Sequence, residues 1–168
     1  IIAVSEQTKR DLIEILQIPE KKISVIYHGG PDIAKKQITP IINDNYILYV
    51  GNRGTYKNFN RFIYCFAQIL KRYPSLKLVC TGKSFDNKET TLFKKLKITD
   101  NIIHIFADDS QLNNLYQHAL AFIYPSLYEG FGIPILEAYA NECPVLLNEK
   151  SCFPEIAQDA AIYFQLDE

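Results

Sequence analysis

The sequence predicts an α/β fold, a Rossmann-like doubly wound parallel sheet with helices on both faces. Strand-like and helix-like segments alternate along the chain, which is the order that repeated strand–helix–strand units produce. The strand-like segments are short and apolar at consecutive positions, as expected for strands that are buried on both faces. With 168 residues, 48% of them hydrophobic, the chain can bury the core of one domain without disulfides or a structural metal.

The first 45 residues contain two predicted strands, one predicted helix and a linker. Strands are predicted at 1–4 and 23–27, and the turn residues at 28–31 close the second one. Ser5 is a suitable N-cap for a helix that runs through Leu16. Residues 32–45 show no regular pattern and are interpreted as a linker.

Residues 46–168 are more regular and are predicted to form one Rossmann-like domain. Ser110 is expected to cap the third helix of this part, and Pro134 to take the first helical position of the fourth, because its missing N–H would be unpaired there anyway. Strands are predicted at 46–50, 76–80, 102–106, 121–124, 144–147 and 161–164, and helices at 58–72, 88–96, 110–118 and 134–140.

Composition and charge exclude several classes of protein. The 18 basic and 19 acidic residues give a net charge of −1, so no nucleic-acid partner is expected. The four cysteines have no C-x-x-C spacing and the three histidines do not cluster near them, which argues against a zinc site and against a disulfide framework. Three of the cysteines adjoin apolar runs, where reduced buried thiols are expected. With no spanning apolar run and no signal peptide, a cytoplasmic location is expected.

Both ends of the chain suggest a fragment. The chain has no methionine, begins on a strand-like run and stops soon after another one. We therefore expect residues 1–45 to lead out of a missing N-terminal domain, and the second domain to be truncated at its C-terminus.

The loop at residues 51–58 is a candidate anion site. It follows a predicted strand and combines Gly51 with the cations Arg53 and Lys57, just before a predicted helix start. Helix N-termini favour anions, arginine can grip a phosphate with two parallel hydrogen bonds, and lysine adds a point charge. A solvated loop with incidental charges is the alternative.

The segment at residues 124–137 is a second candidate site. Its glycines permit a close backbone approach, and the amides of Gly130, Phe131, Gly132 and Ile133 can face a phosphate or a sugar. Glu129 and Glu137 can reach toward the same crevice, where a carboxylate accepts hydrogen bonds from paired sugar hydroxyls. The alternative is one glutamate that offsets the helix dipole and another at the surface.

A third loop, 81–83, also follows a predicted strand, and ligands of open parallel sheets bind at the carboxyl ends of strands. Gly82 would let a flat base lie against the backbone there, although a simple turn explains the same residues.

Several linked motifs in order resemble the family 4 (group 1) glycosyltransferases over nearly the whole chain. The central one is the spacing of Glu129 and Glu137, two glutamates separated by seven residues within Pro125–Glu137. Further similar segments are Val4–Lys9, Ile23–Gly29, Tyr49–Gly51 with Arg53, Lys57 and Asn58, Pro144–Leu146 and Pro154–Ala157. One difference is Asn52, which stands between Gly51 and Arg53 where many members have arginine directly after glycine.

The resemblance implies the C-terminal, donor-binding half of a GT-B fold and assigns roles by position. Arg53 and Lys57 would bind the diphosphate of a nucleotide-diphosphosugar, Glu137 the ribose hydroxyls, and Glu129 the donor sugar. The amides of Phe131, Gly132 and Ile133 would contact sugar and phosphate. Glu129, Arg53 and Lys57 are the expected catalytic residues, and Gly51, Gly82 and Gly130 complete the expected donor site.

The resemblance also implies retention at the anomeric carbon, no cofactor and no essential metal. The sequence contains no Asp-x-Asp, and Asp108-Asp109 is interpreted as helix-start chemistry. The histidines at 28, 104 and 118 are interpreted as packing, turn or surface residues.

The predicted function is the donor-binding domain of a hexosyltransferase in surface polysaccharide biosynthesis. The missing N-terminal domain would supply most of the site for a sugar or lipid-linked acceptor, so the fragment alone is expected to be inactive. A peripheral association of the full-length protein with the inner face of the membrane is compatible with this reading. The alternative is a non-catalytic nucleotide-binding or interaction domain of the same fold.

Overall fold

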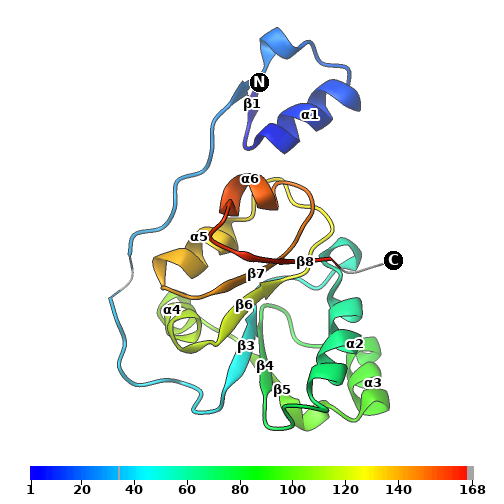
Figure 1. The fold of residues 1–168 in the computed structure, drawn as a ribbon, viewed down its shortest axis with the longest axis vertical. Coiled ribbons are helices and arrows are strands. Elements are labelled where there is room, and N and C mark those ends of the chain that lie inside the picture. Colours follow the sequence, from blue (N-terminus) through cyan, green and yellow to red (C-terminus); the bar gives the residue numbers. More distant parts are fainter. Residues whose placement is uncertain (34, 166–168) are drawn as a thin grey trace.

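The computed structural model describes residues 1–33 and 35–165, and their fold is α/β as predicted (Figure 1). Strands β1 (Ile2–Ala3) and β2 (Ser24–Val25) form a small parallel sheet beside helix α1 (Glu6–Glu14). A six-stranded sheet has the order β5-β4-β3-β6-β7-β8, and every neighbouring pair is parallel. The predicted doubly wound parallel sheet is thus confirmed, with its strand order reversing between β3 and β6.

The elements of the large sheet and its helices follow one another in strict alternation. The strands are β3 (Tyr46–Tyr49), β4 (Lys77–Thr81), β5 (Ile102–Ile105), β6 (Ala121–Tyr124), β7 (Val145–Asn148) and β8 (Ile162–Phe164). The helices are α2 (Phe59–Ile69), α3 (Asn87–Leu96), α4 (Asp109–His118), α5 (Ile133–Ala140) and α6 (Phe153–Ala157). Short 3-10 helices occupy Glu20–Lys22, Thr55–Lys57 and Thr99–Asn101.

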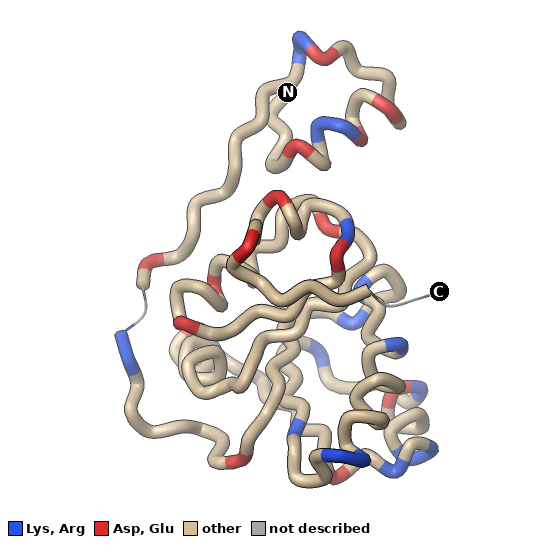
Figure 2. Tube along the Cα trace, viewed as in Figure 1, with Lys and Arg blue, Asp and Glu red and all other residues tan. Residues whose placement is uncertain are grey.

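The sheet separates two hydrophobic cores. Helices α2 and α3 cover one face, and α4, α5 and α6 cover the other (Figure 1). Successive residues of β6 point to opposite faces, so Phe122 and Tyr124 join the core under α4–α6 while Ile123 joins the core under α2 and α3. The two sides also differ in surface charge, since Lys and Arg gather over α2 and α3 and Asp and Glu around α6 (Figure 2).

The register of the central strands leaves β3 and β6 unpaired at their carboxyl ends. Strand β3 pairs with β4 through Tyr49, and β6 pairs with β7 through Tyr124. The β3–β6 ladder between them contains only Ile47 with Ala121 and Leu48 with Phe122. The chains therefore separate beyond Leu48, at the switch point where ligands of doubly wound sheets bind.

Several predicted boundaries were wrong, and one helix was missed. Asp108 and not Ser110 is the N-cap of α4, because its carboxylate accepts the Gln111 amide at 2.8 Å while Gln111 bonds back to the Asp108 amide in a capping box. The interpretation of Asp108-Asp109 as helix-start chemistry is confirmed. Helix α5 begins at Ile133, one residue before Pro134. Helix α6 was not predicted, since its five residues are too short for a periodic pattern.

The predicted linker is held against α4. Asn114, which is buried, donates to the Thr39 carbonyl at 2.9 Å and accepts from the Ile41 amide at 2.9 Å. The Gln37 carbonyl lies 2.8 Å from His118 Nε2, and the Gln37 amide donates to Gln117 at 2.8 Å. The linker thus lies along one helix by way of side-chain to backbone hydrogen bonds, which its irregular composition did not indicate.

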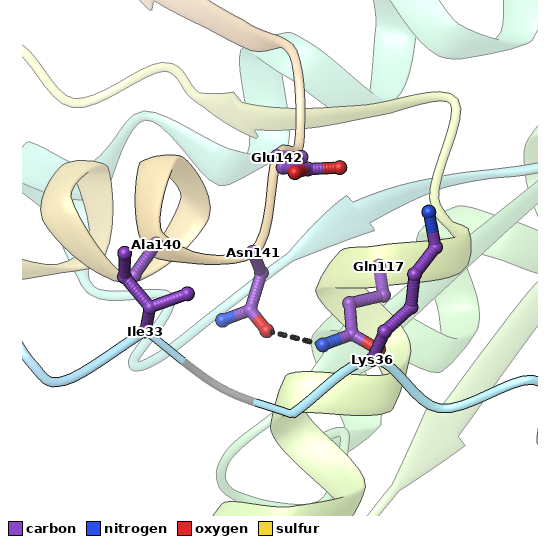
Figure 3. A pocket seen from close by; sticks show the side chains of 6 residues that line it. All are labelled: Ile33, Lys36, Gln117, Ala140, Asn141 and Glu142. Carbon is purple, nitrogen blue, oxygen red and sulfur yellow. Dashed lines mark hydrogen bonds between the residues drawn. The ribbon is translucent and has the colours of Figure 1, made fainter.

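A small cavity separates the start of this linker from the C-terminal ends of α4 and α5 (Figure 3). The Gln117 amide donates to Asn141 Oδ1 at 3.0 Å and closes one side of it. The cavity measures about 130 Å³ and is lined by Ile33, Lys36, Gln117, Ala140, Asn141 and Glu142. It lies at the opposite ends of α4 and α5 from the switch point, so it is separate from the predicted donor site.

Candidate functional site

Two loops that the sequence singled out meet at the switch point. Residues 51–58 follow β3, residues 125–132 follow β6, and the Leu127 amide donates to the Tyr56 carbonyl at 2.8 Å. The hydroxyl of Tyr49, the last residue of β3, donates to the Asn52 carbonyl at 2.8 Å and holds the first loop against the end of that strand. The backbones of the two loops are thus joined directly by a hydrogen bond.

An ion pair links these two loops at the switch point. Lys57 Nζ lies 2.6 Å from Glu129 Oε1, and the two side chains are only 14% and 13% exposed. The Tyr124 hydroxyl lies 3.4 Å from Lys57 Nζ. Burial, followed by the Glu129 carboxylate, raises the pKa of Tyr124, which therefore stays protonated. An ammonium has three N–H donors, so Lys57 can hold Glu129 and still offer donors to a ligand.

Arg53 lies on the same loop but faces another direction. Its Nε atom is 2.6 Å from Glu89 Oε1, and these side chains are only 4% and 11% exposed. Its Nη2 atom donates to the carbonyls of Lys83 and Ser84, and the guanidinium lies 4.6 Å from the centre of the Phe85 ring. Arg53 therefore joins the loop after β3 to α3 and to the loop after β4. Among the described residues its Nη1 atom has no hydrogen-bond partner.

Gly82 permits a close approach between two of the predicted loops. Its φ of +98° is in the left-handed region, and a Cβ atom there would lie 2.8 Å from the Gly51 carbonyl oxygen. Gly51 itself has a φ of +105°. The structure thus gives Gly82 a packing role. An open cavity of about 350 Å³ lies nearby, lined by Asn52, Arg53, Gly54, Lys83, Ser84, Asp86 and Glu89.

The start of α5 presents backbone donors, as the sequence predicted. The amides of Gly130, Phe131, Gly132 and Ile133 donate to no acceptor within residues 1–33 and 35–165. Gly132 precedes the helix with a φ of +94°, and an added Cβ would lie 3.0 Å from Ile135. Such a turn followed by a helix start favours a bound anion.

Glu137 lies in α5, and its carboxylate is already oriented by a neighbour. The hydroxyl of Tyr116, a fully buried residue of α4, donates to Glu137 Oε2 at 3.0 Å. Burial first, and then the Glu137 carboxylate, raises the pKa of Tyr116, so the hydroxyl keeps its proton. The remaining lone pairs of the Glu137 carboxylate can accept further hydrogen bonds.

The N-terminal segment packs directly on the loop that carries Glu129. Ser5 Oγ and Thr8 Oγ1 lie 2.6 and 3.1 Å from the Gly130 carbonyl oxygen, and Ser5 caps α1 as predicted. The His28 ring meets the Phe131 ring edge-on at 5.0 Å. At the N-terminal end of α1, the Glu155 carboxylate accepts the amides of Glu6 and Gln7.

The cysteines and histidines near this site contact its residues through packing and backbone hydrogen bonds. All four cysteines are free, and burial raises the pKa of Cys143 and of Cys152 to about 12. His104 bonds to the Gly82 carbonyl between two phenylalanine rings. Over residues 1–33 and 35–165 no three His, Cys, Asp or Glu side chains form a group that could hold a metal ion.

Sequence reasoning missed three residues that shape the site: Tyr124, Glu89 and Ser151. Tyr124 is the last residue of a predicted strand, and Glu89 falls inside the helix predicted at 88–96, with no pattern that singles it out. Ser151 Oγ accepts the Glu129 amide at 3.0 Å and donates to the Glu129 carbonyl at 2.7 Å. No local pattern marks contacts between segments 22 to 67 residues apart, so only the fold reveals them.

Comparison with known proteins gives consistent results. Residues 32–165 match the family model described as glycosyl transferases group 1. The chain is 30% identical over 172 aligned residues to the O-antigen chain mannosyltransferase RfbU of Salmonella typhimurium, and 29% identical over 164 to the capsular polysaccharide biosynthesis glycosyltransferase CapM of Staphylococcus aureus. These alignments cover 100% and 87% of the chain but only 47% and 42% of the relatives.

Solved structures show the same fold. A glycosyltransferase from Rickettsia africae superposes with a TM-score of 0.82 at 22% identity, over 99% of this chain and 49% of that one. No helix in the described parts of the chain is both long and apolar enough to cross a membrane.

Proposed function

The chain belongs to the glycosyl transferases group 1, and we propose that it is the donor-binding domain of a retaining, metal-independent enzyme with the GT-B fold. The enzyme would move a hexosyl group from a nucleotide-diphosphosugar to a sugar or lipid-linked acceptor. Relatives named for O-antigen and capsular polysaccharide synthesis support a role in surface polysaccharide assembly. The relatives named mannosyltransferases support mannose as the sugar transferred.

The observation that carries this proposal is the Lys57–Glu129 pair at the switch point. It sets a cation and a carboxylate side by side where β3 and β6 separate, 2.6 Å apart. A donor has an anionic diphosphate next to a sugar with hydroxyls, so a cation and a hydrogen-bond acceptor at adjacent positions match its chemistry.

The proposed mechanism is electrostatic. Lys57 and the amides at the start of α5 would stabilise the nucleoside diphosphate as it departs, while an acceptor hydroxyl attacks the anomeric carbon. Glu129 would contact the donor sugar, and Glu137, oriented by Tyr116, would accept the ribose hydroxyls. Arg53 would join the diphosphate only after its guanidinium leaves Glu89 and the two carbonyls.

The acceptor site is proposed to lie mainly outside this chain. The chain spans about half the length of the curated relatives it matches. The transfer activity is therefore proposed for the whole protein. Positioning of the acceptor hydroxyl supplies much of the rate of such a reaction. We therefore propose that this chain alone binds donor and transfers no sugar, and that the full-length protein acts in the cytoplasm at the inner face of the membrane.

A thermal-shift screen tests the donor proposal directly. The chain is heated with UDP, GDP and ADP and with their sugars, the mannose derivatives included, because a specific ligand raises the melting temperature by mass action. One nucleoside diphosphate and its sugar should stabilise the chain above the corresponding nucleoside. A chain that none of them stabilises would favour the alternative of a non-catalytic interaction domain.

A further inference from the structure

Three side chains from the end of β7 to the N-cap of α6 bond the backbone of the loop that carries Glu129. Asn148 Nδ2 donates to the Ser126 carbonyl at 3.2 Å, and Cys152 Sγ donates to the Phe131 carbonyl at 3.1 Å. Ser151 lies between them and contacts Glu129. The segment 148–152 thus holds the loop 126–131 at its start, middle and end.

Ser151 makes the most complete of these contacts. Its hydroxyl accepts the Glu129 amide at 3.0 Å and donates to the Glu129 carbonyl at 2.7 Å. One hydroxyl therefore satisfies both backbone groups of the same residue, which restricts the rotation of Glu129 about its backbone. The Glu129 side chain, which extends to Lys57, therefore starts from a backbone that is held in one position.

The backbone at Ser151 is unusual for a serine. Its φ of +59° is in the left-handed region, which residues other than glycine avoid. The segment is held in this shape by the next two residues, Cys152 and Phe153, which are fully buried and begin α6. Strain of this kind persists where the surroundings over-determine it, often close to a functional site.

We propose that Ser151 is a positioning residue that fixes Glu129 for contact with the sugar of the donor. This inference rests on the function proposed above and deepens it. Ser151 itself touches neither the phosphate nor the sugar in this arrangement, and acts through Glu129. Its loss should therefore weaken recognition of the sugar and spare recognition of the diphosphate, for which Lys57 and the α5 amides remain.

Two variants separate the hydroxyl from the backbone strain. Ser151→Ala removes the hydroxyl and keeps a side chain in the left-handed region, whereas Ser151→Gly removes the hydroxyl and relieves that strain. Ser75→Gly is the matched control, because Ser75 is an exposed turn residue away from the switch point. Affinities of the whole chain are measured by calorimetry for the nucleoside diphosphate and hexose derivative that the parent binds, among UDP, GDP and ADP.

Both Ser151 variants should bind the nucleotide-sugar about tenfold more weakly relative to the diphosphate than the parent does, as small misplacements of a contact group are costly. Ser75→Gly should keep the ratio of the parent. An unchanged ratio in Ser151→Gly, or an equal loss for both ligands, would overturn the positioning role. A parent that binds no probe would contradict the proposed function, and the sugar role with it.

Hydrogen exchange gives a second reading that needs no ligand. The Glu129 amide should exchange faster in Ser151→Gly than in the parent, because its acceptor has been removed, while amides of β6 keep their protection. Unchanged protection of the Glu129 amide would show that Ser151 does not hold Glu129, whatever the ligand measurements give.

Discussion

Two ion pairs of the same length take their cations from the same loop, but the two cations differ in their surroundings. Lys57 meets Glu129 across the switch point, and Arg53 meets Glu89 on the side of β4 and α3, both at 2.6 Å. Arg53 also donates to two carbonyls and lies against Phe85. Lys57 has a second, longer contact to the Tyr124 hydroxyl at 3.4 Å and lies 5.1 Å from the centre of the Tyr56 ring. Charge and burial alone would have made the two cations equivalent.

The difference between them lies in how many protein groups hold each cation. Arginine has five N–H donors in a rigid fork, and the Nε and Nη2 atoms of Arg53 donate to three protein acceptors within the fold. The ammonium of Lys57 is a compact group at the end of a flexible stem, placed where the strands separate. We infer that Arg53 mainly holds two loops together, while Lys57 is poised to exchange its partner for a ligand.

The largest effect should come from Arg53→Ala. Removing the guanidinium leaves the Glu89 carboxylate nearly buried without its cation, so the free energy of unfolding should fall by about 3–5 kcal/mol. Lys57→Ala should cost clearly less, because fewer protein contacts are lost. Urea unfolding of both variants, with exposed Arg61→Ala as the control, measures the difference. Equal losses of unfolding free energy in Arg53→Ala and Lys57→Ala would show that the two ion pairs stabilise the fold to the same extent, against this prediction.

The second effect concerns ligand binding. Lys57→Ala should weaken binding of the preferred nucleoside diphosphate by about 1–3 kcal/mol, as the loss of a charge-assisted hydrogen bond would. The parent nucleoside should bind the variant and the parent chain equally, since it has no diphosphate. Calorimetric titration checks both. The assignment fails if the variant keeps the full diphosphate affinity.

A smaller effect is expected from Glu89→Gln. Glutamine at this position can keep the capping box with Asp86, while Arg53 loses the carboxylate that holds it. If Arg53 swings toward the diphosphate on binding, as its predicted role requires, the affinity should rise by about 0.5–1.5 kcal/mol. An affinity equal to that of the parent would instead confine Arg53 to holding the loops.

The order of elements and the main loops could be predicted from the sequence because their signals are local. Consecutive apolar residues mark the buried strands, and the Glu129–Glu137 spacing marks the turn into α5. Helix boundaries were less accurate, because Asp108 and Ser110 both favour the N-cap position before α4 and the sequence alone does not say which one accepts the amide.

The orientation of side chains could not be predicted, because it depends on residues distant in sequence. Arg53 is held by Glu89, 36 positions away, and Glu129 by Ser151, 22 positions away. The sequence showed two cations beside a glycine, but the positions of their carboxylate partners follow only from the packing of α3 and of the loop after β7.

The smallest change is expected on removing divalent metal. Two carboxylates that lie beside the predicted phosphate loop, Glu129 and Glu89, are already paired with a cation at 2.6 Å. A metal would therefore have to displace Lys57 or Arg53 before it could bridge protein and phosphate, whereas Lys57 and the α5 amides can meet the phosphate charge directly. Titration of the nucleoside diphosphate with and without EDTA should differ by less than about 0.4 kcal/mol, roughly a twofold change in affinity. Adding Mg²⁺ back serves as the control. A tenfold loss of affinity under EDTA, recovered when Mg²⁺ is added back, would show that a metal bridges the phosphates. The proposed difference between the two ion pairs, in which Lys57 binds the phosphate directly, would then be wrong.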